Sequence, residues 1–265
     1  HTGPVAVAKG LVPLCRRPTP PSRAAASTVA VAAFIASSAA GVTGGRRAQR
    51  PSNIGFSSLE VLMEDEHVLV INKPAGLLSQ SASRGDDCLV KRARHHLAQG
   101  NDPFVGLVHR LDRDVTGVCI LAKTKLAARW LSRQFASRTV RKEYVGIVRR
   151  WSSEGVRLLR NTMEVDEGGQ AHEADPESPG AQAAALECRS IGSGPSGASA
   201  LLVRLHTGRR HQIRYQLATA ESALLGDRRY GSGCRDGSRK WIQRPALHAW
   251  RLRFAHPAEP HSVCE

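Results

Sequence analysis

The first 59 residues contain no acidic side chain, and this composition restricts where along the chain a folded core can form. Ala, Ser, Pro and Gly are abundant in this stretch, and its arginines are Arg16, Arg17, Arg23, Arg46, Arg47 and Arg50. A segment with so few large apolar side chains buries too little surface to offset the conformational entropy lost on folding. We therefore expect the folded part of the chain to begin near residue 59.

The same stretch has the composition of an organelle transit peptide, which is rich in Arg and Ser and nearly free of acids. Within it, residues 28–40 (TVAVAAFIASSAA) are small and apolar like the hydrophobic region of a signal, so a two-part leader is one interpretation. A low-complexity extension with no targeting role is the alternative. We predict a leader over residues 1–58 that delivers the protein to an organelle, a mitochondrion or plastid. Without such an address the protein would be cytoplasmic.

The whole chain carries a formal net charge of +15 and a pI of about 10.4, which favours a polyanionic partner. Each phosphate neutralised by Lys or Arg releases condensed counterions, so basic surfaces bind nucleic acids. A basic targeting segment without any nucleic acid is the alternative source of the charge. No run of about 18 consecutive apolar residues occurs, so we expect no membrane-spanning helix. The six cysteines form no C-x-x-C pair, which argues against a zinc site.

Apolar periodicity after residue 57 predicts a mixture of strands and helices. Strands are expected at 59–63, 68–71, 118–122, 144–148, 183–191, 200–205 and 247–254, and helices at 89–97, 126–135 and 212–219. Residues 152–180 are polar and rich in Gly and Pro, so no regular structure is assigned there. This order predicts a single α+β domain over residues 59–258, built on a mixed, largely antiparallel sheet with flanking helices. Residues 259–265 are expected to form a tail.

The segment His109–Gly117 interrupts two apolar runs with charged side chains. A charged loop that enters a buried strand places its side chains at a sheet edge, where functional sites often lie. The arginines around Asp112 favour its ionised form, as a nucleophile or base requires. A surface turn in which Asp112 pairs locally is the alternative.

A second charged segment, Leu205–Arg214, leads from a predicted strand through Gly208 into a predicted helix. Exposed amides at a helix N-terminus together with Arg side chains suit a phosphate group. Arg214 would lie in the first turn, where its planar guanidinium could hold a carboxylate with two hydrogen bonds. A helix start with solvated charges is the alternative. A third segment, Lys142–Tyr144, begins a strand with an aromatic side chain, which more often packs than reacts.

Several other classes of chemistry have little support. There is no G-x-x-x-x-G-K-[ST] loop and no G-x-S-x-G elbow. One G-x-G-x-x-G match occurs at residues 192–197, but it lies between two predicted strands and opens no helix, so it is interpreted as a hairpin turn. Nucleotide hydrolysis, dinucleotide redox chemistry and serine hydrolysis are therefore disfavoured.

Six blocks in order along the chain resemble the RluA-type pseudouridine synthase family. They are Val70–Gly76 (VINKPAG), His109–Gly117 (HRLDRDVTG), Lys142–Tyr144 (KEY), Thr207–Arg214 (TGRRHQIR), Gly226–Gly231 (GDRRYG), and Leu247–Ala249 (LHA) with His256–Pro257. The resemblance implies a pseudouridine-synthase-like catalytic domain that isomerises uridine in ribosomal or transfer RNA, after the target base has been flipped out. It implies no metal and no small-molecule cofactor, and we expect a monomer.

The resemblance also assigns roles to individual residues. The family's catalytic carboxylate corresponds to Asp112, its active-site tyrosine to Tyr144 and the arginine that pairs with the carboxylate to Arg214. Arg110 corresponds to the arginine that helps to displace the target base. We predict further RNA contacts at Lys73, His109, Arg209, Arg210 and His211. An RNA-binding or RNA-chaperone protein with an inactive site and a nucleoside hydrolase are the alternatives from other classes.

Overall fold

Eleven strands form one mixed sheet in the computed structural model of the chain, which describes residues 58–265 except 84, 99, 101, 195–196 and 232–241. The strands are β1 (Glu60–Glu64), β2 (Val68–Lys73), β3 (Gly106–Leu107), β4 (Thr116–Ala122), β5 (Arg141–Val148), β6 (Val156–Val165), β7 (Ala171–Glu173), β8 (Gln182–Ser193), β9 (Ser199–Leu205), β10 (Leu247–Ala255) and β11 (Val263–Cys264). The helices are α2 (Leu89–Leu97), α3 (Lys125–Ala136) and α4 (Gln212–Thr219).

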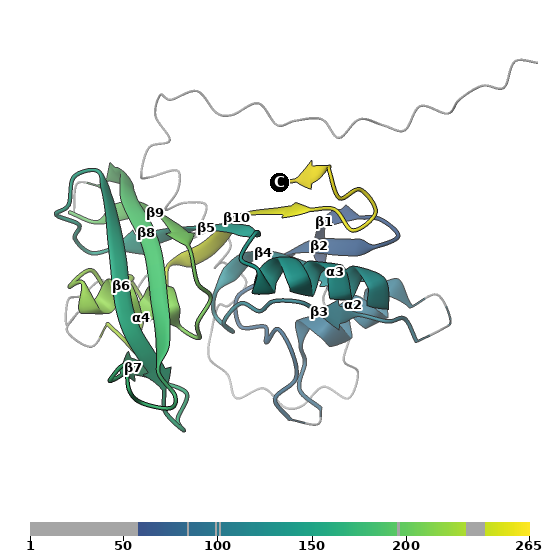
Figure 1. Cartoon of the computed structure of the whole chain (residues 1–265), viewed down its shortest axis with the longest axis horizontal. Coiled ribbons are helices and arrows are strands. Elements are labelled where there is room, and N and C mark those ends of the chain that lie inside the picture. Colours follow the sequence, from purple (N-terminus) through teal and green to yellow (C-terminus); the bar gives the residue numbers. More distant parts are fainter. Residues whose placement is uncertain (1–57, 84, 99, 101, 195–196, 232–241) are drawn as a thin grey trace, which may run out of the picture.

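The strand order is β1-β2-β4-β10-β5-β9-β8-β6-β7, with β3 paired to β4 and β11 paired to β10. Among the described strands, only the β4–β10 pair is parallel. In Figure 1, α2 and α3 lie beside the half of the sheet that contains β1, β2 and β4, whereas α4 lies beside β6 and β8. The mixed, largely antiparallel sheet with flanking helices confirms the predicted α+β class.

Strand β2 is buried on both faces because its alternating side chains enter two different cores. Val68 and Val70 pack with Leu131 of α3, whereas Leu69 packs with Leu89 of α2. A strand covered on both faces needs a continuous apolar run instead of an alternating pattern, which is why VLVI could be recognised as a strand. Helix α3, with 12 residues, is the longest helix in the described part of the chain, and none of these helices could span a bilayer.

The region left without regular structure, residues 152–180, contains β6 and β7. Only Leu159 and Met163 of the ten residues in β6 are buried, so the apolar signal in its sequence is weak. The strand forms because eight of its residues pair in register with β8, from Val156 opposite Arg189 to Met163 opposite Gln182. The two-residue strand β11 lies within the predicted tail and pairs with the end of β10.

The parallel contact between β4 and β10 determines how the two halves of the sheet meet. Ala249 on β10 is in register with Gly117 on β4 and with Tyr144 on β5. Gly117 has φ of +119°, and a Cβ atom at this position would lie 2.2 Å from the carbonyl oxygen of Ala249. Only glycine permits both the backbone conformation and the close approach. The loop that precedes β4, which carries Asp112, is thereby brought next to β5.

We expect Gly117→Ala to lower the free energy of unfolding by about 3 kcal/mol or more, because it adds a steric overlap with Ala249 to the strain of a positive φ. Gly155→Ala is the matched control, since Gly155 also has positive φ (+73°) but no atom within 4 Å of the added Cβ. It should cost only about 1–2 kcal/mol. Denaturant unfolding followed by circular dichroism measures both, and equal losses would contradict the packing role of Gly117.

Candidate active site

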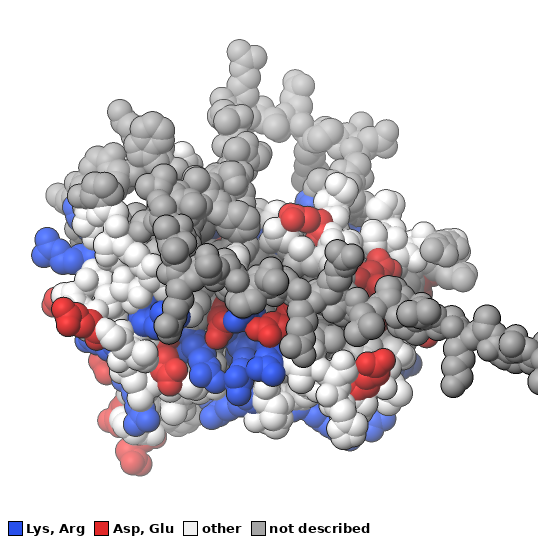
Figure 2. All heavy atoms as spheres, turned by 90° about the horizontal axis from the view of Figure 1, so that it is seen from above, with Lys and Arg blue, Asp and Glu red and all other residues white. Residues whose placement is uncertain are grey.

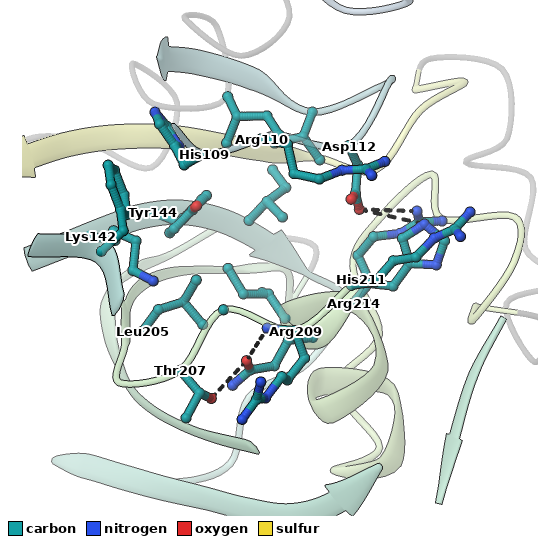
Figure 3. A pocket seen from close by; sticks show the side chains of 18 of the residues that line it. His109, Arg110, Asp112, Lys142, Tyr144, Leu205, Thr207, Arg209, His211 and Arg214 are labelled. Atoms are coloured by element: carbon teal, nitrogen blue, oxygen red, sulfur yellow. Dashed lines mark hydrogen bonds and ion pairs between the residues drawn. The ribbon is translucent and has the colours of Figure 1, made fainter. Parts of the chain in front are cut away.

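A cavity of about 450 Å³ lies between the loop before β4, the strand β5 and the start of α4 (Figure 3). Its volume is in the range of small-molecule binding pockets. Asp112 is the only carboxylate among the described residues that line it. The basic residues that line it are Arg110, Arg138, Lys142, Arg209, Arg210 and Arg214. Lys and Arg side chains also gather near the middle of the face drawn in Figure 2. The cavity therefore suits an anionic ligand.

The three residues assigned to catalysis from the sequence all line this cavity. Asp112 comes from the loop before β4, Tyr144 from β5 and Arg214 from the first turn of α4. The Nη1 atom of Arg214 lies 3.4 Å from Oδ2 of Asp112, and Figure 3 shows the Tyr144 hydroxyl directed into the same space. Asp112 and Arg214 are 102 residues apart in the sequence, and the structure brings their side chains together.

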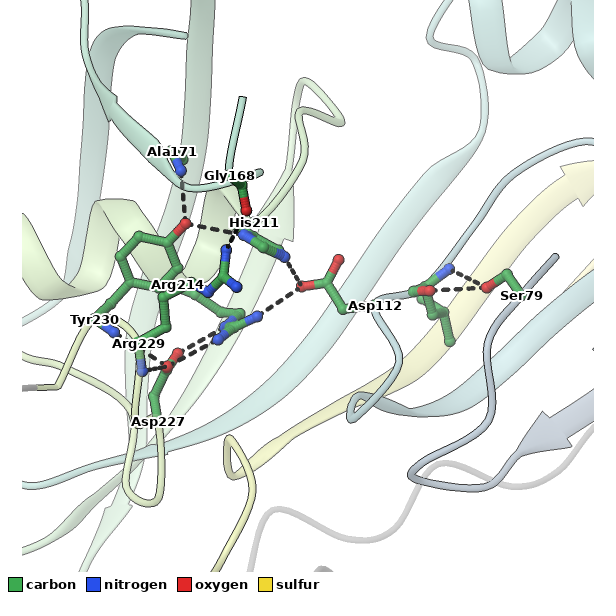
Figure 4. Close-up of polar contacts among 10 residues, drawn as sticks. Ser79, Asp112, Gly168, Ala171, His211, Arg214, Asp227, Arg229 and Tyr230 are labelled. Atoms are coloured by element: carbon green, nitrogen blue, oxygen red, sulfur yellow. Dashed lines mark hydrogen bonds and ion pairs between the residues drawn. The ribbon is translucent and has the colours of Figure 1, made fainter. Parts of the chain in front are cut away.

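Arg214 is held mainly by a second carboxylate, Asp227, which is 1% exposed (Figure 4). The Nε and Nη2 atoms of Arg214 donate to the two oxygens of Asp227 at 2.7 and 2.9 Å. Asp227 also accepts the backbone N–H groups of Arg229 and Tyr230. The guanidinium is therefore oriented independently of Asp112, and its Nη1 atom is left to face that carboxylate. Burial lowers the pKa of Arg214, but the hydrogen bonds and charge of Asp227 outweigh this effect and raise it above its ordinary value.

Sequence reasoning assigned no role to Asp227. The only signal was its position in the block Gly226–Gly231, where an acidic residue precedes Tyr230. Nothing in that local pattern indicates that the carboxylate is buried beneath Arg214, because the contact depends on how the loop after α4 folds back against the helix.

His211 lies between Asp112 and Tyr230. Its Nε2 atom lies 3.8 Å from Oδ2 of Asp112, and its Nδ1 atom lies 2.9 Å from the hydroxyl of Tyr230. That hydroxyl accepts the backbone N–H of Ala171 at 2.7 Å. Burial lowers the pKa of His211 to about 4, although the charge of Asp112 opposes the effect. At neutral pH the imidazole is therefore uncharged, and the positive charge paired with Asp112 is that of Arg214.

Tyr144 contributes an uncharged hydroxyl to the cavity. Its side chain is buried, and burial raises the pKa of the phenol above its ordinary value, with a further contribution from the charge of Asp112. Within the part of the chain that the structure describes, the hydroxyl makes no hydrogen bond. The group is thus a neutral donor or acceptor available to a bound ligand.

Lys73, which the sequence predicts as an RNA contact, has a completely buried side chain in this structure. Its ammonium donates to the carbonyl oxygens of Pro74, Leu77 and Arg113 at 2.9, 2.8 and 3.0 Å, which uses all three N–H groups. Burial lowers the pKa of Lys73 to about 8. Its function is to tie the end of β2 to the loop that carries Asp112.

Two more contacts anchor the same loop. The Oγ atom of Ser79 donates to the carbonyl oxygen of Leu111 at 2.8 Å and accepts the N–H of Leu111 at 3.1 Å (Figure 4). His109 lines the cavity, but its Nε2 atom accepts the backbone N–H of Ile120 at 3.0 Å, and its ring stacks on Phe135. Burial, assisted by the charge of Lys142, lowers the pKa of His109 to about 3. The His109 ring is therefore held in place by contacts within the protein.

Three arginines predicted to contact RNA lie at the cavity, as His211 does. Arg110 and Arg210 are exposed and Arg209 is half-buried, and all three line it. They line a cavity in which Asp112, the single carboxylate among the described lining residues, pairs with the Arg214 guanidinium and shares the space with the uncharged Tyr144 hydroxyl. The site is therefore of a class that combines a single carboxylate with several surrounding Lys and Arg side chains.

Comparisons with known proteins agree with this class. Residues 67–219, more than half of the chain, match the model of the family described as RNA pseudouridylate synthase. The chain is 34% identical over 208 residues to the Uncharacterized RNA pseudouridine synthase YhcT of Bacillus subtilis, covering 76% of the chain and 66% of the relative. It is 35% identical over 213 residues to Ribosomal large subunit pseudouridine synthase D of Xylella fastidiosa, covering 75% and 62%. The chain therefore spans slightly less than two thirds of the length of these relatives.

The fold agrees as well. The structure is similar to that of Human RNA Pseudouridylate Synthase Domain Containing 1, with a TM-score of 0.61, 25% sequence identity, and coverage of 82% of this chain and 86% of that one. The chain belongs to the RluA-type family of RNA pseudouridine synthases, as its six sequence blocks predict.

We expect Asp227→Asn to lower the free energy of unfolding by about 3 kcal/mol, because it leaves the guanidinium of Arg214 buried without its main counterion. Glu187→Gln is the matched control, since Glu187 is 36% exposed and pairs with Arg204 and His206 at the surface. It should cost less than about 1 kcal/mol. Urea unfolding at neutral pH measures both free energies of unfolding. If Asp227→Asn lowered this free energy no more than Glu187→Gln, the structural importance of the Asp227–Arg214 ion pair would be contradicted.

Proposed function

We propose that the protein isomerises uridine to pseudouridine in RNA, with Asp112 as the catalytic carboxylate. The observation that carries the proposal is the pairing of Asp112, the one carboxylate among the described residues lining the basic cavity, with an arginine that Asp227 already orients. Membership of the pseudouridine synthase family supports the same reaction. A basic rim with one acid suits a substrate that carries phosphates and reacts at a single sugar–base bond.

The reaction is balanced without a further reactant. The bond between C1′ and N1 of the uridine breaks, the uracil turns, a bond between C1′ and C5 forms, and the C5 proton moves to N1. A carboxylate beside C1′ or the base assists as a nucleophile or by stabilising the separated sugar. Both routes use the carboxylate oxygens of Asp112, and the guanidinium of Arg214 lies 3.4 Å from one of them.

The other side chains position the substrate. A uridine within a helix must be flipped out to reach Asp112, at a cost of a few kcal/mol. Arg110, exposed at the rim of the cavity, would fill the gap and offset part of that cost. The ring of Tyr144 would lie against the extruded uracil, and its neutral hydroxyl would hydrogen-bond to the nucleotide or move a proton from the sugar.

We propose a ribosomal or transfer RNA as the substrate and a monomer as the active form, with no metal and no cofactor. The Xylella fastidiosa relative is named for the large ribosomal subunit, which supports a ribosomal target. Mapping pseudouridines in ribosomal and transfer RNA from cells with and without the protein tests the choice, because the modified position should disappear with the protein.

We expect Asp112→Asn to reduce tritium release from RNA labelled at carbon 5 of uridine by more than about a thousandfold, because the amide is a poor nucleophile and cannot accept the developing charge. RNA binding should survive, since the substitution preserves shape and removes a negative charge. Asp114→Asn, at an exposed carboxylate two residues away, is the control and should retain turnover. Substantial turnover by Asp112→Asn would refute the assignment, and free uracil among the wild-type products would show hydrolysis instead of isomerisation.

We propose that residues 1–58, which lie outside the described residues apart from Ser58, deliver the protein to a mitochondrion or plastid. The support is compositional: the segment has many Arg and Ser residues and no acid. A fluorescent protein fused behind residues 1–58 should accumulate in one of these organelles, whereas the same fusion with its six arginines replaced by glutamine should stay in the cytosol. Cytosolic fluorescence of the unmodified fusion would contradict the proposal.

A further inference from the structure

Three cations meet at a part of the cavity that lies away from Asp112. Lys142 is on β5, Arg138 follows α3, and Arg209 precedes α4. In Figure 3, Lys142 and Arg209 are well separated from Asp112, with Tyr144 on the Lys142 side of the cavity. A Cβ atom built on Gly208 would lie 3.1 Å from Nζ of Lys142, so the amine lies close to the backbone that leads into α4.

No carboxylate neutralises this cluster within the described part of the chain. Lys142 has neither a hydrogen bond nor an ion pair there, and the guanidinium of Arg138 also has none. The Nε atom of Arg209 donates only to the carbonyl oxygen of Ala183, at 3.2 Å. Glu143, the neighbour of Lys142 in sequence, pairs instead with Arg251. Three positive charges are thus held together without an anion.

The mutual repulsion acts on the pKa of Lys142. Burial lowers the pKa of its ammonium, and the charges of Arg138 and Arg209 lower it further. Like charges that are held at a cavity wall destabilise the empty protein, and an anion placed among them removes that cost. The cluster is therefore better suited to a ligand than to a structural role.

The donors in this cluster indicate the chemistry of the ligand. An ammonium and two guanidinium groups offer N–H donors from three directions and no acceptor. A uracil edge carries an N3–H donor that would need an acceptor, whereas the oxygens of a phosphodiester only accept. Arg and Lys are the side chains that bind phosphate best, the first through a planar fork and the second as a point charge.

We propose that Lys142, with Arg138 and Arg209, binds a phosphodiester group next to the target uridine. The proposal rests on the function proposed above and adds a second anchoring point to it. The nucleotide would span the cavity, with its sugar–base bond at Asp112 and a flanking phosphate at Lys142. The phosphate contact would set how far the flipped nucleotide enters.

The test is the salt dependence of RNA binding by the full chain. Fluorescence anisotropy with a labelled, uridine-rich single-stranded RNA gives the dissociation constant between about 50 and 200 mM KCl. Lys142→Gln should weaken binding about tenfold at the lowest salt and reduce the slope of log K against log salt by about 0.7, the value for one lost contact to a single strand. Lys142→Arg should preserve the slope, because it retains the charge.

Lys125→Gln is the matched control, since Lys125 is exposed on α3 and does not line the cavity. It should leave both the affinity and the slope unchanged. Arg138→Gln is a second variant at an exposed position, and it should lose a similar part of the slope even if Lys142→Gln folds poorly. Thermal melting of each variant shows whether the fold is retained.

Either of two results for folded variants would overturn the phosphate site. Lys142→Gln and Arg138→Gln could bind RNA like the wild type, or they could bind more weakly with an unchanged slope, which would indicate a contact to a neutral group. These results leave the proposed function intact as long as the wild type releases tritium from labelled RNA. Absence of that release would refute the proposed function, whatever the salt slopes show.

Discussion

The site depends on one residue in the middle of the sheet, Ala249, whose backbone is in register with Gly117 on one side and Tyr144 on the other. The contact with Gly117 belongs to the only parallel pair among the described strands, and it requires a residue without a Cβ atom. Because Asp112 precedes Gly117 by five residues, this pairing places the carboxylate loop beside the strand that carries Tyr144. Without it, Asp112 and Tyr144, the groups proposed to act in catalysis, would belong to two separate halves of the sheet.

Polar contacts inside the protein hold the loop that carries Asp112 in place. Lys73 uses all its donors on carbonyl oxygens, Ser79 makes two hydrogen bonds with Leu111, and His109 accepts the N–H of Ile120. Each of these side chains is committed to the protein itself, so the loop is oriented before any ligand arrives. Lys73 and His109, which the sequence predicts as RNA contacts, thus stabilise the loop through bonds inside the protein.

The charges around Asp112 are arranged with an excess of cations on the side where a ligand enters. Arg214 is shared between two carboxylates, Asp227, which orients it, and Asp112, which its Nη1 atom faces. His211 remains neutral because of its burial and adds no charge. Within the described part of the chain, Lys142, Arg138 and Arg209 line the cavity without a carboxylate partner. This arrangement supports the proposed phosphate contact near the proposed catalytic carboxylate.

The sequence alone determined the family, the α+β class and most of the elements. The continuous apolar run of β2, the helical period of α3 and the six ordered blocks are local patterns, and local patterns survive without knowledge of the fold. Only the tertiary structure decided which strands pair and which side chains contact one another. The strand β6 exists because β8 pairs with it, Lys73 is buried because three carbonyl oxygens surround its amine, and Asp227 reaches Arg214 because a loop folds back on α4. Such contacts join residues that are distant in the chain, and a one-dimensional pattern carries no information about which of them meet.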